Sequence, residues 1–178
     1  MKKILFSVFT LISIGMFAQK LDVRWSPLVE PGVGKSQHFI PLGQSDEGSI
    51  VGTISNSKGT ITELVKIDSD LNNHVKIKVD FEEEITEASF ILRGRVVVFT
   101  SKTEGNYKTI YARFAEGNNL GEPRVIIKNS IKGGKFHFSA SPNGKYLGII
   151  AEAPYLKGKN EEILTWILDD QLLSLIHI

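Results

Sequence analysis

One pattern of short apolar segments, four in each complete copy, occurs three times between residues 38 and 172, and it constrains the fold more than any other feature of this sequence. The second segments of the three copies begin near Ser49, Arg95 and Lys145, which gives intervals of 95 − 49 = 46 and 145 − 95 = 50 residues. Turn residues separate the segments, and each segment has the length and the alternation of a β-strand. A repeat of this period with four strands in each unit is typical of β-propeller blades.

The third copy contains the clearest hairpin, in residues 136–150. Its residues Ser141-Pro142-Asn143-Gly144 fit a type I turn, because Pro142 presets φ at the second position and Gly144 accepts the left-handed conformation that follows. The strand after this turn is largely apolar on both faces, which indicates a sheet that is covered on both sides.

We therefore expect an all-β fold of antiparallel four-stranded blades, about three blades of an incomplete β-propeller. The expected blades span residues 38–81, 85–128 and 135–172, and the third copy is expected to stop before its fourth strand. Closed propellers contain about four to eight blades, so three blades leave two apolar faces uncovered.

The end of the third copy also has a helical interpretation. In EEILTWILDDQLLSLI, the residues Ile163, Trp166, Ile167 and Leu172 could also line a helix. We favour a strand, because EILTWILDD aligns with TELVKIDSD and TIYARFAEG in the other copies.

Residues Ser141 to Leu147, SPNGKYL, resemble the S-P-D-G-K-x-L signature of the TolB-like, WD-type β-propeller repeats of bacterial envelope proteins. The later ILTWILDD is similar to the I-Y-V-M-D segment of that family. The turn residues of the first two copies differ from the signature, so only the strand pattern extends the resemblance to them. The resemblance implies the propeller fold but no single function, because such propellers serve as binding platforms, gating domains and catalytic domains.

The N-terminus has the layout of a signal peptide over residues 1–18. Lys2 and Lys3 precede an apolar run from Ile4 to Phe17, and the small residue Ala18 marks a cleavage point. The run is shorter than the ~20 residues of a membrane-spanning helix, so we expect export to the periplasm or the cell exterior and no membrane span after cleavage. Residues 19–37 are expected to form an N-terminal strand and loop.

The other end carries the hexamer LSLIHI, residues 173–178, which resembles the translation of a transposon mosaic end used as a sequencing adapter. We expect these residues to be foreign to the protein and the natural chain to be cut there.

Composition excludes several classes of protein. The chain has 21 Lys plus Arg against 20 Asp plus Glu, so it shows no charge bias towards nucleic acid. It contains no Cys, which rules out disulfides and the lipid anchor of exported bacterial proteins. No cofactor is expected.

No motif of catalysis or metal binding is complete. Gly34-Lys35-Ser36 lacks the first glycine of a phosphate-binding loop, and the calcium-like Asp68–Asn72 lacks its glutamate, so both are interpreted as loops or turns. Glu82–Glu84 is expected to be a solvated connection between blades, and the four histidines have no metal-ligand spacing. Trp25, Trp166 and the phenylalanines are interpreted as packing residues.

The longest loop within a blade, residues 154–160, carries Tyr155, Lys157 and Lys159. Binding residues concentrate on loops that a rigid scaffold holds, so we predict a partner-binding surface there. The sequence favours an exported, non-enzymatic binding platform for a protein or a small ligand. The alternatives are a purely structural array or the N-terminal propeller of a larger secreted hydrolase, such as a prolyl-oligopeptidase-like peptidase, whose catalytic domain is missing.

Overall fold

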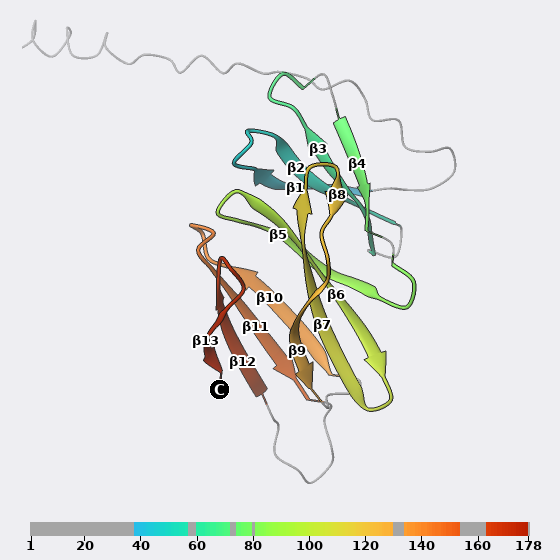
Figure 1. Cartoon of the computed structure of the whole chain (residues 1–178), viewed down its shortest axis with the longest axis vertical. Helices are drawn as coiled ribbons and strands as arrows, with labels where there is room; N and C mark the ends of the chain where they lie inside the picture. The colour runs from blue at the N-terminus through green and yellow to red at the C-terminus, as the bar shows by residue number, and fades with distance from the viewer. Residues whose placement is uncertain are drawn as a thin grey trace, which may run out of the picture.

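The computed structural model describes residues 38–56, 60–71, 74–79, 81–129, 134–153 and 163–177. These residues form strands and turns only, in three antiparallel sheets that follow one another along the chain (Figure 1). The all-β class and the three antiparallel, blade-like sheets expected from the sequence are confirmed. Within the described part of the chain, no helix is long and apolar enough to cross a membrane.

The first and third sheets each contain four strands in chain order, and the second contains five. The strands of the first sheet are β1 His38–Gln44, β2 Ile50–Ser55, β3 Ile61–Ile67 and β4 His74–Lys78. Those of the second are β5 Ile85–Leu92, β6 Arg95–Glu104, β7 Tyr107–Glu116, the short β8 Asn119–Leu120 and β9 Arg124–Asn129. Those of the third are β10 Lys135–Ala140, β11 Tyr146–Glu152, β12 Ile163–Asp169 and β13 Ser174–His177.

The third sheet corrects one prediction and confirms another. Its fourth strand, β13, pairs with β12, whereas the sequence interpretation ended the copy before a fourth strand. The edge of β12 offers unpaired backbone groups, so an apolar segment that follows a tight turn pairs there whatever its origin. The segment around Trp166 is a strand and not a helix, as favoured above.

The predicted turns are present. The amide of Gly144 donates to the Ser141 carbonyl at 2.8 Å, and Gly144 has φ +62°, the left-handed conformation that was expected to follow the turn. The calcium-like segment is a turn in which Leu71 N–H donates to the Asp68 carbonyl. The third sheet repeats this turn, with Leu172 N–H donating to Asp169, so Asp68 serves the turn as predicted.

Consecutive sheets pack face to face through the middle strand of the second sheet. On β6, Val96 and Val98 pack in a cluster with Val51 and Leu64 of the first sheet. The alternate residues of β6 belong to the cluster that includes the third sheet; they are Val97 and Phe99, which pack with Leu147, Ile149, Trp166 and Leu168. A strand that is apolar on both faces is thus covered on both sides, as expected.

Backbone hydrogen bonds also link the hairpin turns of consecutive sheets. Asp46 N–H donates to the Gly94 carbonyl at 3.0 Å, and Arg93 N–H donates to the Gly144 carbonyl at 3.1 Å. Gly94 has φ +77°, and a Cβ at this position would lie 2.6 Å from the Cβ of Asp46, so only glycine permits this approach. The first strands of consecutive sheets also lie beside one another, β1 beside β5 and β5 beside β10.

Candidate functional site

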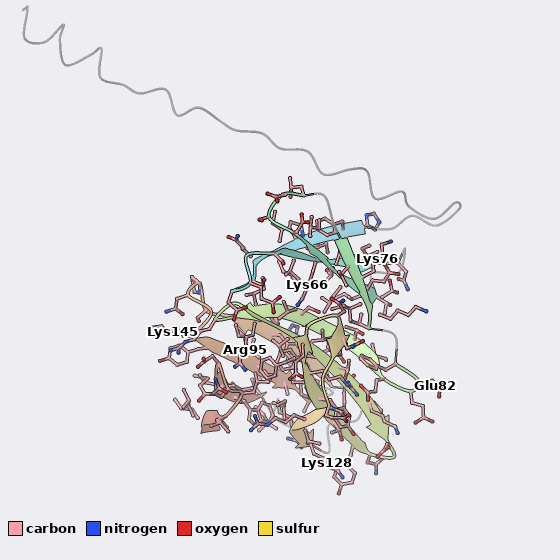
Figure 2. The ribbon with its side chains drawn as sticks, turned by 45° about the horizontal axis from the view of Figure 1, so that its top comes forward. Lys66, Lys76, Glu82, Arg95, Lys128 and Lys145 are labelled. Carbon is pink, nitrogen blue, oxygen red and sulfur yellow. The ribbon has the colours of Figure 1, made fainter. Side chains whose placement is uncertain are left out.

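A polar cleft lies between the first two sheets, at the end where β1 turns into β2. It has a volume of about 210 Å³. Figure 2 labels two of its residues, Lys66 from the first sheet and Arg95 from the second. The full lining is Ser45, Asp46, Glu47, Lys66, Gly94, Arg95, Val96, Ala115 and Glu116.

Lys66 is a buried cation in the wall of this cleft. It is the next-to-last residue of β3, its exposed fraction is 9%, and its Nζ donates to the Gly117 carbonyl of the second sheet at 3.1 Å. The same Nζ lies 3.5 Å from Oε2 of Glu47, which is largely exposed. Lys66 therefore links the first sheet to the β7–β8 turn of the second sheet and forms an ion pair with Glu47.

The side-chain hydroxyl of Ser45 is a buried polar group of this site. The residue is 8% exposed, and its Oγ is buried without a hydrogen-bond partner in the described part of the chain. A buried hydroxyl without a partner costs about 1–3 kcal/mol, so a ligand or an ordered water that satisfies it is stabilised there. Ser45 lines the cleft, so this buried hydroxyl lies in the cleft wall.

The charge of the lining is acidic. Asp46, Glu47 and Glu116 supply three carboxylates against the two cations Lys66 and Arg95. The Arg95 guanidinium is engaged elsewhere, because it lies 4.4 Å from the ring centroid of Phe114 and donates to the Asp170 carbonyl of the third sheet. The arrangement therefore suits a small group with a positive charge and hydrogen-bond donors.

A second buried polar group, Glu84 with Arg113, lies between the first two sheets. The Arg113 guanidinium binds the Glu84 carboxylate through two bonds of 2.7 and 2.9 Å. The Thr100 hydroxyl bonds to both partners, and the guanidinium carbon lies 4.1 Å from the ring centroid of Phe81. Glu84 is therefore not solvated, and the interpretation of Glu82–Glu84 is wrong at this residue: the connection turns the third carboxylate inward, while Glu82 and Glu83 are exposed.

The second and third sheets share a similar, smaller group. Glu87 Oε1 accepts a hydrogen bond from Ser101 at 2.6 Å and lies 2.8 Å from Lys108 Nζ. Lys108 Nζ lies 5.0 Å from the ring centroid of Phe136 on the third sheet. Each contact between sheets thus contains one carboxylate that a cation of β7 neutralises.

The Arg113 guanidinium holds the pKa of Glu84 below its ordinary value of 4.5, against the opposing effect of burial. A carboxylate with a depressed folded-state pKa stabilises the fold above the unfolded-state pKa, and this stabilisation is lost as pH falls through the folded-state value. We therefore expect wild-type stability to fall between about pH 5 and pH 2 more steeply than that of Glu84→Gln. Urea unfolding across this range measures both slopes, and parallel curves would contradict the assignment.

Several predicted residues lie outside the described residues. These are Tyr155, Lys157 and Lys159 of the predicted binding loop, the segment Gly34–Ser36, and Trp25. Trp166 is buried in the packing cluster, as interpreted. His38 and His137 are exposed, and among the described residues no group of three or more His, Asp or Glu is placed to hold a metal ion.

Sequence reasoning missed the functional candidates Ser45 and Lys66. A signal for the lysine was present, because Lys66 interrupts the apolar run of β3 in the same way that Arg113 interrupts β7. A charge within such a strand predicts a buried partner, although it does not identify one. Ser45 gave no signal, because its burial depends on the approach of the second sheet.

The chain was compared with protein families, curated proteins and solved structures. No family model, no curated protein and no solved structure matches this chain.

Proposed function

We propose that this chain is an exported, non-enzymatic binding module of the β-propeller type, built from repeats that resemble the TolB-like, WD-type repeats. The signal-like residues 1–18 support export to the periplasm or the cell exterior. Three stacked antiparallel sheets with linked turns support the blade arrangement. Such a scaffold holds its turns and loops rigidly, which is what a binding surface needs.

The single observation that carries the binding proposal is the acidic cleft with the unsatisfied Ser45 hydroxyl. An ammonium or guanidinium group entering it would donate to this hydroxyl and to the carboxylates of Asp46 and Glu47. Charge-assisted hydrogen bonds of this kind are the strong ones in recognition. The partner we propose is a protein that presents a lysine or arginine side chain, and the loop with Tyr155, Lys157 and Lys159 is a proposed second contact.

A titration followed by amide NMR tests the cleft. With Nα-acetyl-lysine methylamide and Nα-acetyl-arginine methylamide as probes, we expect saturable shifts at the amides of Ser45, Asp46 and Gly94. Nα-acetyl-norleucine methylamide, which has no charge, is expected to give none. Glu47→Gln should weaken binding about tenfold, equivalent to about 1.4 kcal/mol.

Glu82→Gln is the matched control for this titration, because it removes an exposed carboxylate at the edge of the molecule (Figure 2). It should leave the affinity unchanged. Equal loss in both variants would show only a general effect of net charge, and shifts spread over the whole surface would refute a site at the cleft.

A further inference from the structure

The turn between β10 and β11 contains the dipeptide Asn143-Gly144, and an Asn-Gly pair occurs once in this sequence. Asn143 is exposed in the turn, so water reaches its side chain. Asparagine is among the thermolabile residues of proteins, because the backbone nitrogen of the next residue can attack its side-chain amide. A glycine in the next position has no side chain to hinder this attack, so Asn143 is the asparagine of this chain that is most open to it.

Hydrogen bonds hold both reacting groups in the folded turn. The Gly144 N–H donates to the Ser141 carbonyl at 2.8 Å. The Asn143 Oδ1 accepts the Ser141 hydroxyl at 2.8 Å and the Lys145 N–H at 3.1 Å. The Ser141 hydroxyl is itself held, because its Oγ accepts the Tyr146 N–H at 3.0 Å. The Gly144 nitrogen can therefore attack the Asn143 side chain only after the turn opens.

We propose that Asn143 is a site of non-enzymatic deamidation and that the folded turn slows the reaction. The Gly144 nitrogen loses its proton to water and forms a bond to Cγ of Asn143, and the side-chain nitrogen takes up a proton and leaves as ammonia. Water then opens the resulting succinimide ring at either carbonyl. Scission of the new bond leaves aspartate, and scission of the original backbone bond leaves isoaspartate. The reaction needs water alone, and the inference does not depend on the proposed binding function.

The two products affect the turn differently. Aspartate keeps an oxygen in the place of Oδ1, so the hydrogen bonds from Ser141 and Lys145 can form again. Isoaspartate carries the backbone through the side chain and so lengthens the turn by a methylene group. The Gly144 carbonyl accepts the Arg93 N–H of the second sheet at 3.1 Å, so we expect isoaspartate to break this link between the sheets.

Peptide mapping by mass spectrometry tests the site. The full chain is incubated at mildly alkaline pH, folded in buffer or unfolded in urea, and the mass change from amide to carboxyl is followed at each asparagine. We expect Asn143 to react at least about tenfold faster in the unfolded chain, because the reaction in the fold requires local opening. Asn106 is the internal control, because it is exposed in the β6–β7 turn but precedes Tyr107, and it should stay unmodified while Asn143 reacts.

Ser141→Ala tests the protection by the turn. It removes the hydroxyl that donates to Asn143 Oδ1 and should raise the rate in the folded chain about three- to tenfold, the effect of losing one ordinary hydrogen bond. Ser139→Ala is the matched control, because Ser139 is exposed on β10, and it should leave the rate unchanged. If Ser141→Ala does not fold, the comparison of folded and unfolded wild type still decides.

Each part of the proposal has a result that would overturn it. Failure of Asn143 to react in urea, or reaction of Asn106 at the same rate, would overturn the site. Equal rates in the folded and unfolded chain would overturn the protection by the turn, as would equal rates in folded Ser141→Ala and Ser139→Ala. Hydrogen exchange at the Arg93 amide reads the products: we expect protection to be lost in the isoaspartate form and kept in Asn143→Asp, and equal protection in both would overturn the effect on the sheet contact.

Discussion

Arg113→Ala is expected to lower the free energy of unfolding by about 3–5 kcal/mol, because it leaves the carboxylate of Glu84 buried and unpaired. The two side chains share two hydrogen bonds, and each is only slightly exposed, 8% for Arg113 and 13% for Glu84. Burial of a charge without its partner is among the largest effects of a single substitution. Chemical denaturation of the full chain at neutral pH measures the loss.

Two controls separate this effect from a general loss of charge. Lys145→Ala removes an exposed cation from the β10–β11 turn and should change stability by less than about 0.5 kcal/mol. The double variant Glu84→Leu with Arg113→Met replaces both partners by apolar groups and should recover part of the loss. A cost for Arg113→Ala no larger than that of Lys145→Ala would contradict the buried pair.

Phe99→Ala is expected to have an effect of similar size, about 3–5 kcal/mol, through loss of packing between the second and third sheets. Phe99 is fully buried, and its ring centroid lies 5.2 Å from that of Phe138 and 6.3 Å from that of Phe90. The matched control is Phe39→Ala, the same change at a ring that is 47% exposed. Its cost should be clearly smaller, and equal costs at the two sites would contradict the placement of Phe99.

Local features of this fold could be predicted from the sequence. The Ser141–Gly144 turn depends on Pro142 and Gly144 alone, and the strand pattern depends on alternation within a few residues. The period of the repeat then gave the number of sheets. These features are decided by neighbours in the chain, which is why one sequence sufficed.

Features that depend on the contact between sheets could not be predicted. The partner of Glu84 lies 29 residues away, and its identity depends on the register of β6 with β7.

The repeat interval in the sequence also does not predict which face of a sheet a residue occupies. Val97 and Leu147 are 147 − 97 = 50 residues apart, the interval of the repeat, yet Val97 faces the third sheet and Leu147 faces the second. The hairpin at Ser141–Lys145 is longer than the two-residue turn Arg93-Gly94, and a change of one residue in register reverses every side chain of a strand.

The candidate cleft contains one residue that the sequence could indicate and one that it could not. Lys66 could be identified from the sequence as a charge within an apolar strand. Ser45 could be identified only from the structure, in which its neighbour Asp46 is hydrogen-bonded to the Gly94 turn of the second sheet. Polar groups in turns have no periodic pattern, so their burial has to be read from the packed structure.

The central claim is that consecutive sheets stack face to face, and a double-mutant cycle between Phe99 on β6 and Phe138 on β10 tests it most directly. The two rings belong to different sheets and are in contact only if these sheets pack as described. We predict a coupling energy of about 0.5–1.5 kcal/mol in the unfolding of Phe99→Ala, Phe138→Ala and the double variant. Strict additivity of the two single losses would contradict the stacking.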